Sequence, residues 1–144
     1  MPVAKKQPSK AELIAHIRTT YLFSSLEEDV LQDLSEDLTW VSLKPGENLF
    51  RQGDDSDSTY LVIDGLLNVA IARMDGSEMF VGENKPGELI GEMGLFTGQS
   101  RTASIYADTE SSAEVVKIPE SGFRRMASEN PQVWAHVGET IHQR

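Results

Sequence analysis

The segment PGELIGEMGLFTGQSRTASIYA, residues 86–107, sets a glycine-rich stretch between two short apolar runs. Gly91 follows the first run and permits a tight turn there. Residues 92–96 fit a single helical turn, which Gly98 then breaks. The second apolar run, residues 103–107, is typical of a strand. The segment therefore predicts a loop with one helical turn, held between two strands.

The loop contains one base, Arg101, and one acid, Glu92. Backbone amides at the start of a helical turn lack intrahelical partners and can bind anions. An arginine can bind a phosphate through its planar guanidinium group. Thr102 adds a hydroxyl donor, while Glu92 could accept a hydrogen bond from a sugar hydroxyl. A sugar phosphate would suit this set. An ordinary Arg101–Glu92 ion pair explains the same spacing equally well, so both interpretations stay open on the residues alone.

The chain has 144 residues, a length that suits one domain with a substantial core. It carries 13 basic and 23 acidic residues, for a formal net charge of −10, and the bases are scattered. Binding to a nucleic acid backbone or an anionic membrane requires a basic surface. We therefore expect neither partner, and a small anionic ligand would need a strong local positive feature.

The chain contains no cysteine, which excludes disulfides, thiolate catalysis and thiolate metal sites. This absence fits a reducing compartment. The opening residues MPVAKKQPSK have no apolar run behind them, so we expect no signal peptide. No stretch has the apolar length needed to span a bilayer. We expect a cytoplasmic protein.

Two helices are predicted before residue 39. Residues 10–19 place apolar side chains at helical spacing, after a lead of residues 1–9. Ser25 and Glu28 form a capping box that predicts the start of a second helix. The acids of this helix lie mostly opposite its apolar stripe, so we expect them to form a solvated face. The stripe consists of Leu26, Val30, Leu31, Leu34 and Leu38.

Between residues 39 and 119, short apolar runs alternate with turn signals. Pro-Gly, Gly-Asp and Asp-Gly pairs separate the runs, and Asp75-Gly76 is typical of a β-hairpin. Spacing of this kind favours an antiparallel sandwich or barrel of about eight strands over a parallel α/β sheet. The runs lie at residues 40–43, 60–63, 66–72, 79–82, 89–90, 103–107 and 113–118.

The last quarter of the chain is predicted to be helical. Residues 120–130 offer one apolar side, and Asn130 followed by Pro131 fits the start of a final helix. An apolar stripe continues along residues 133–141. This pattern meets no stop signal before Arg144, so we expect the chain to be a piece of a longer protein.

Catalytic and metal-binding patterns are missing from the sequence. His16, His136 and His142 fall on predicted helices, and no set of ligands converges from the strands. The DDSDS segment, residues 54–58, lacks the glycine and glutamate of a calcium loop, so we expect a self-capped turn there. A G-x-S-x-G elbow is also missing. We expect no metal and no catalytic residue, and hence no enzyme within this chain.

Residues 86–107 closely resemble the phosphate-binding cassette of cyclic nucleotide-binding domains, which occur in bacterial catabolite-activator-type regulators, kinases and channels. The cassette combines Gly-Glu, a short helix, a variable loop and an Arg-(Ala/Ser/Thr)-Ala end. Residues 43–69 resemble the early strands of the family, with its G-E-x-L-F-x-x-G-D segment, and residues 123–133 resemble the helix after the barrel. The residues that match the cassette are Gly91, Glu92, Arg101, Thr102 and Ala103.

The resemblance implies a mainly β fold, a jelly roll (double-stranded β-helix) of about eight antiparallel strands with helices on both sides. Residues 22–144 would form the cyclic nucleotide-binding domain, with a short or truncated helix at its end. Residues 1–21 would be a flexible lead with a short helix. The comparison with bacterial regulators also favours a bacterial source.

The resemblance further implies a 3′,5′-cyclic nucleotide ligand, cAMP or cGMP, and no other cofactor. Arg101 would form an ion pair with the cyclic phosphate, and Glu92 would accept a hydrogen bond from the ribose 2′-hydroxyl. Backbone amides at the start of the helical turn would line the sugar phosphate. The full ligand-binding set would be Gly91, Glu92, Met93, Arg101, Thr102 and Ala103.

In this family a C-terminal helix moves to cover the base, and that movement transmits the binding signal. The helix would begin near Pro131 here. The chain would then be a regulatory module of a larger signalling protein or enzyme, and similar domains precede bacterial patatin-like phospholipases. Its partner would be a covalently linked effector domain or a second copy, reached through the C-terminal helix. The alternative is a degenerate domain that keeps the fold as a protein-interaction or dimerisation module.

Overall fold

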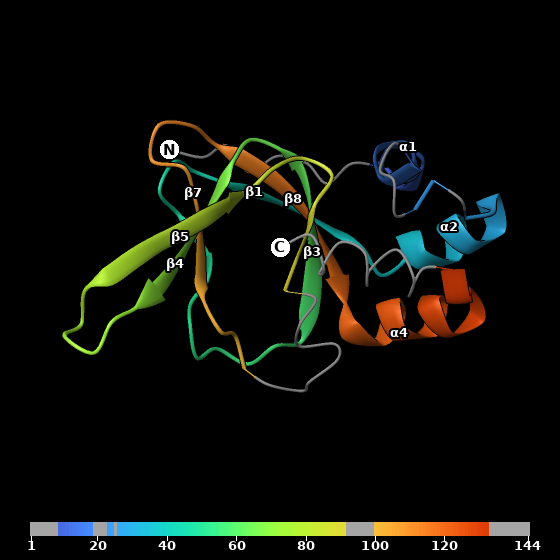
Figure 1. Cartoon of the computed structure of the whole chain (residues 1–144). Helices are drawn as coiled ribbons and strands as arrows, with labels where there is room; N and C mark the ends of the chain where they lie inside the picture. Colours follow the sequence, from blue (N-terminus) through green and yellow to red (C-terminus); the bar gives the residue numbers. More distant parts are fainter. Residues whose placement is uncertain (1–8, 19–22, 25, 92–99, 133–144) are drawn as a thin grey trace.

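The computed structural model describes residues 9–18, 23–24, 26–91 and 100–132. This part of the chain forms eight strands and three helices, and Figure 1 shows the strands wrapped into a jelly roll with the helices beside it. The predicted mainly β class with flanking helices is confirmed. The helices are α1 (Lys10–Arg18), α2 (Glu28–Ser35) and α4 (Glu120–Glu129).

The strands form two antiparallel sheets of four strands each, with the orders β1-β8-β3-β6 and β2-β7-β4-β5. Among the strands of the described residues, only β4 and β5 are neighbours both in sequence and in a sheet. The chain therefore crosses repeatedly between the sheets, as a jelly roll requires. The strands are β1 (Thr39–Leu43), β2 (Asn48–Phe50), β3 (Ser58–Asp64), β4 (Leu67–Ala72), β5 (Glu78–Asn84), β6 (Leu89–Ile90), β7 (Ser104–Ala107) and β8 (Ala113–Pro119).

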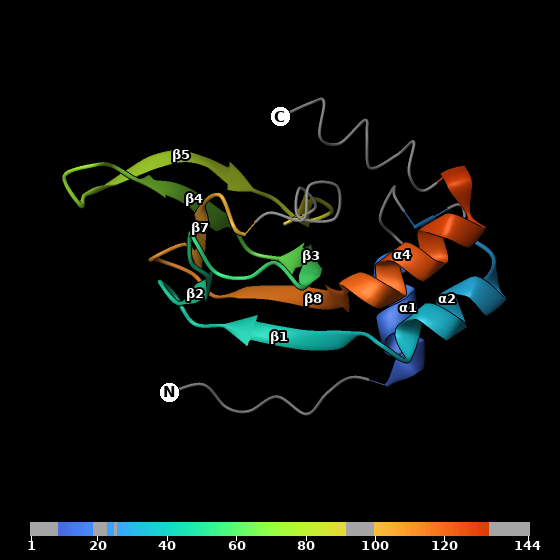
Figure 2. The same cartoon turned by 90° about the horizontal axis from the view of Figure 1, so that it is seen from below.

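The first sheet separates two apolar cores. Successive side chains of a strand point to opposite faces, so Leu61 of β3 joins the core beneath the helices while Val62 joins the core between the sheets. Leu89 and Ile90 of β6 divide in the same way. Figure 2 shows the helices at one end of the sheets and the β4–β5 hairpin reaching toward the other. Residues 58–62 of β3 are all buried, because both faces of this strand are covered.

The acidic face of α2 is partly neutralised by its neighbours. The sequence predicts a solvated face there, but basic side chains of α1 and α4 reach it. All these side chains are still exposed, so each pair contributes only about 0.2–1 kcal/mol. The pairs are Lys10–Glu36 (3.3 Å), Arg18–Glu28, Arg125–Asp33 (3.6 Å) and Arg125–Asp37 (3.1 Å).

The predicted Asp75-Gly76 hairpin is confirmed, since it joins the paired strands β4 and β5. Gly76 has a φ of 88°, in the left-handed region that glycine adopts readily. The Asp75 carboxylate accepts hydrogen bonds from the Ser77 hydroxyl at 2.6 Å and from the Ser77 N–H at 2.9 Å. These two bonds, the hydroxyl first, hold the pKa of Asp75 below its ordinary value.

The predicted start of the second helix is wrong. Glu27 is the N-cap of α2, and its side chain makes no capping hydrogen bond. The proposed cap, Ser25, lies outside the described residues. A turn in which the Leu26 N–H donates to the Phe23 carbonyl at 3.2 Å comes just before the helix, so the helix begins only at Glu28.

Three short features differ from, or add to, the sequence prediction. A cap of the expected chemistry occurs at α1, where the Glu12 N–H donates to Ser9 Oγ at 3.2 Å and Ser9 Oγ donates to the Glu12 carboxylate at 3.2 Å. Strand β2, with three residues, is not among the predicted runs. The Asn130 amide donates to the Met126 carbonyl at 2.9 Å and thereby closes the end of α4.

Candidate ligand-binding site

Arg101 lies just before β7, where its main chain is fixed by the turn that follows β2. The Arg101 N–H donates to the Asp54 carbonyl at 2.8 Å, and the Gly53 N–H donates to the Arg101 carbonyl at 2.8 Å. The same turn is closed by the Asp54 carboxylate, which accepts the Arg51 N–H at 2.9 Å. The self-capped turn predicted for residues 54–58 instead lies at residues 51–54, where Asp54 caps the Arg51 N–H, and it positions Arg101.

The Arg101 side chain is buried, with only 6% of its surface exposed. Its Nη2 donates to the Ser58 carbonyl at 2.8 Å, and its Nη1 donates to the Gly91 carbonyl at 3.4 Å. A buried cation is costly unless polar groups replace its water. These two carbonyl dipoles, from β3 and from the end of β6, supply part of that replacement.

Two aromatic rings also lie close to the guanidinium group. Its Cζ atom lies 4.1 Å from the centre of the Phe50 ring, over the ring face, and 5.8 Å from the centre of the Tyr60 ring. The two rings lie 5.9 Å apart at an angle of 37°. The negative face of an aromatic ring attracts a cation, so Phe50 and Tyr60 stabilise the charge without neutralising it.

Gly91 is placed against Arg101 in a position that suits glycine. Its φ is 82°, and a Cβ atom added there would overlap Arg101 Nη1. Both the backbone conformation and the contact with Arg101 therefore favour glycine here. The structure brings together Gly91 and Arg101, two residues of the predicted ligand set, and the segment between them (residues 91–101) is called the anion loop.

The other residues of the predicted ligand set have different places. Thr102 is exposed and Ala103 is half-buried, both between Arg101 and β7. Glu92 and Met93 lie outside the described residues, and so does the proposed Arg101–Glu92 pair. Of the predicted final helix, only Pro131 and Gln132 are described, and they are helical.

Sequence reasoning on the residues missed Ser58, Phe50 and Tyr60. Ser58 contributes a main-chain carbonyl, which no side-chain pattern reveals. Phe50 and Tyr60 resemble ordinary core residues of strands. The one available signal was the G-E-x-L-F-x-x-G-D segment, because its Phe50, Gly53 and Asp54 all contact Arg101.

The described residues offer little for other chemistry. Within them, no group of three His, Asp or Glu side chains is arranged to hold a metal ion. His16 is exposed on α1, with its ring 4.9 Å from the Trp40 ring. None of the helices in the described ranges has the length and apolar character that crossing a bilayer demands.

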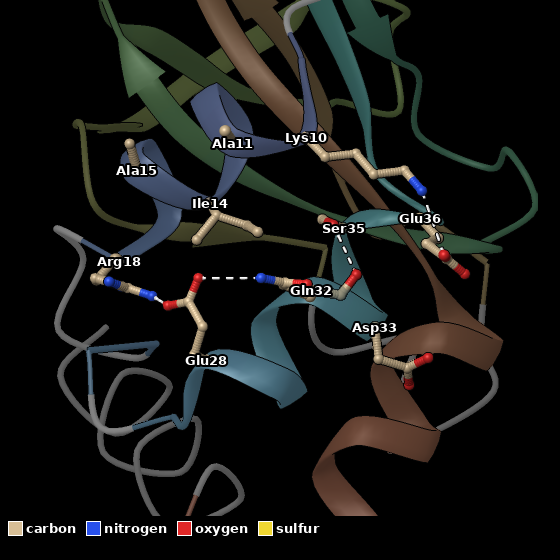
Figure 3. A pocket seen from close by; sticks show the side chains of 10 residues that line it. All are labelled: Lys10, Ala11, Ile14, Ala15, Arg18, Glu28, Gln32, Asp33, Ser35 and Glu36. Carbon is tan, nitrogen blue, oxygen red and sulfur yellow. Dashed lines mark hydrogen bonds and ion pairs between the residues drawn. The ribbon is translucent and has the colours of Figure 1, made fainter.

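A separate pocket of about 490 Å³ lies between α1 and α2 (Figure 3). On the α1 side it is lined by two alanines and Ile14. Figure 3 shows two ion pairs, Lys10–Glu36 and Arg18–Glu28, that join the two helices across it. Because these charges already pair with one another, the pocket presents no concentrated charge, and the stronger candidate site is at Arg101.

The chain is similar to segments of much longer phospholipases. It is 34% identical over 131 residues to lysophospholipase nte1 of Aspergillus terreus, which covers 91% of this chain and 8% of that protein. It is 29% identical over 140 residues to patatin-like phospholipase domain-containing protein 7 of Rattus norvegicus, which covers 97% of this chain and 10% of that protein. The chain thus spans a small fraction of the length of these relatives. They are fungal and mammalian, so a bacterial source stays a prediction.

Among solved structures, the regulatory domain of Toxoplasma gondii PKA, crystallised with cAMP, shares the fold. Its TM-score is 0.80 at 15% sequence identity, and the match covers 94% of this chain and 50% of that chain. Residues 40–130, more than half of the chain, match the family described as the cyclic nucleotide-binding domain. The loop from Gly91 to Arg101 lies within this match. The chain therefore belongs to the cyclic nucleotide-binding domain family.

Proposed function

We propose that this chain is a regulatory module that binds a 3′,5′-cyclic nucleotide, cAMP or cGMP, through Arg101. The observation that carries the proposal is the guanidinium group of Arg101, which is buried and fixed beside the Gly91 carbonyl. A planar guanidinium group matches two oxygens of a phosphate. Family membership supports the cyclic nucleotide as the source of that phosphate.

The remaining roles follow the same proposal. Glu92 accepts the ribose 2′-hydroxyl, the amides of Gly91, Glu92 and Met93 line the sugar phosphate, and Thr102 and Ala103 lie beside it. Binding moves the C-terminal helix that begins near Pro131, and an effector domain in the same polypeptide receives the signal. The phospholipase relatives support an effector of that class. The chain itself has no catalytic role in this scheme.

Thermal unfolding with added nucleotide tests the proposal. A ligand that binds only the folded state stabilises it by about 2.7 kcal/mol at a concentration of 100 Kd. We expect cAMP or cGMP to raise the Tm of the wild-type chain, and calorimetric titration to give a saturable Kd. Noncyclic 5′-AMP and 5′-GMP should give much smaller shifts.

The Arg101→Gln variant should lose this response, because it removes the cation and keeps a polar but shorter side chain. Arg51→Gln is the matched control, since Arg51 is an exposed arginine next to the same turn. It should respond like the wild type. If saturating amounts of both cyclic nucleotides leave the wild-type Tm unchanged, the proposal fails, and light scattering should then test the chain as a dimerisation module.

A further inference from the structure

Phe50 lies face-on against the guanidinium group of Arg101, at 4.1 Å from the ring centre to Cζ. We propose that Phe50 is a positioning residue, which holds the guanidinium group of Arg101 in the place where it accepts an anionic ligand. The inference rests on the proposed cyclic nucleotide binding and adds a residue outside the anion loop to it. Phe50 acts through Arg101, and nothing in the proposal requires it to touch the ligand.

The contacts around Arg101 restrain its guanidinium group. A cation centred over a ring face at this distance is attracted to the ring but can still slide parallel to it. The hydrogen bond from Nη2 to the Ser58 carbonyl, at 2.8 Å, then opposes sliding. Together these contacts restrain the position of the group. A guanidinium group binds a phosphate more tightly when it is already held in place, because less conformational freedom is lost on binding.

The electrostatics favour a ring over a carboxylate for this task. The Phe50 ring and the Ser58 carbonyl carry no formal charge, so these two contacts hold the arginine without subtracting from its positive charge. The chain has a formal net charge of −10, which opposes the approach of any anion. A support without charge therefore suits an anion site in this protein better than a carboxylate would.

Phe50 is itself held in place by strand pairing and by packing. It ends β2, where it pairs with Ile105 of β7, the strand that follows Arg101. Its side chain is half-buried against the core between the sheets and lies 5.9 Å from the Tyr60 ring. The ring is thus part of β2, and Arg101 lies just before β7, the strand that pairs with β2 in the same sheet.

Two variants of Phe50 test the proposal in the whole chain. Phe50→Leu keeps an apolar side chain but removes the flat ring, and we expect it to weaken cyclic nucleotide binding about tenfold, in line with a desolvated cation–π contact. Phe50→Trp restores a flat aromatic face and should bind within about threefold of the wild type. Calorimetric titration with cAMP and cGMP measures both. Phe23→Leu is the control, since it makes the same change at a buried ring in the helix-side core.

NMR of the free protein provides a measurement that needs no ligand. The ring current of Phe50 should shift the side-chain protons of Arg101 upfield in the wild type, and Phe50→Leu should return them toward ordinary values. Arg101→Lys identifies these signals by their loss.

The outcomes separate the two proposals. If the wild type binds neither nucleotide, the proposed function fails, while the shift of the Arg101 signals still reports the Phe50 contact. If the wild type binds and Phe50→Leu binds equally well, the positioning role is overturned. Equal weakening by Phe50→Leu and Phe23→Leu would also overturn it, because the effect would then be a general loss of stability.

Discussion

At the scale of single residues, Gly91 shows how closely backbone and function are joined. Gly91→Ala would place a methyl group in the left-handed region and against Arg101 Nη1. We expect a loss of about 1–3 kcal/mol in unfolding free energy and a drop in cyclic nucleotide affinity of at least roughly tenfold. Chemical denaturation and calorimetric titration measure the two effects.

Gly87→Ala is the matched control for this prediction. Gly87 also has positive φ, 93°, but nothing lies within 4 Å of an added Cβ. It should show the backbone cost, about 1–2 kcal/mol, without the loss of affinity. Equal affinity losses in both variants would contradict the role of the Gly91–Arg101 approach.

A second prediction concerns the protonation of Asp75 in the hairpin turn. Its pKa is lowered by the hydrogen bonds from Ser77, so the folded state binds its proton more weakly than the unfolded state does. The resulting stabilisation is complete above the ordinary aspartate pKa of about 3.9 and is lost as the pH falls through the lower, folded-state value. NMR titration of the Asp75 carboxylate should show this low midpoint, and Ser77→Ala should raise it. An unchanged midpoint in Ser77→Ala would count against the assignment.

At the scale of elements, the Glu114 carboxylate ties two strands together. It accepts hydrogen bonds from Trp40 Nε1 at 2.5 Å and from Ser42 Oγ at 2.6 Å, so it joins β8 to β1 through side chains as well as backbone. We expect Glu114→Ala to lower the unfolding free energy by about 1–3 kcal/mol in urea denaturation. Glu83→Ala removes the same charge from an exposed position on β5 and should cost far less. Similar losses of unfolding free energy in the two variants would show that the charge, and not the hydrogen bonds to Trp40 and Ser42, is responsible.

The elements also show which features the sequence could predict. Turns such as Asp75-Gly76 depend on local chemistry, so the hairpin and most strands could be predicted. The start of α2 could not, because the competing turn from Phe23 to Leu26 has no strong residue signature. At the site, Arg101 stood out as the base of a glycine-rich loop. Its supports at Ser58 and Phe50 come from distant strands, and one of them is a carbonyl that every residue possesses.

At the scale of the whole molecule, β3 joins the two cores and should make them unfold together. Leu61 and Leu67 are fully buried, the first in the helix-side core and the second in the core between the sheets. We expect each Leu→Ala change to cost about 2–5 kcal/mol. In both variants, unfolding followed by circular dichroism and by tryptophan fluorescence should coincide. Separate transitions in Leu61→Ala would indicate that the helices and the jelly roll are independent.

The burial of β3 on both faces also limits how the molecule can respond to a ligand. A shift of one residue would exchange Tyr60 and Leu61 between the cores, so this strand cannot slide. The Ser58 carbonyl is therefore a stationary reference point for any displacement that a ligand causes at Arg101. A fluorescent sensor built on this chain should therefore carry a reference dye at Asp64, the exposed end of β3. Its second dye, which reports the change, belongs on a part of the chain that moves when the ligand binds.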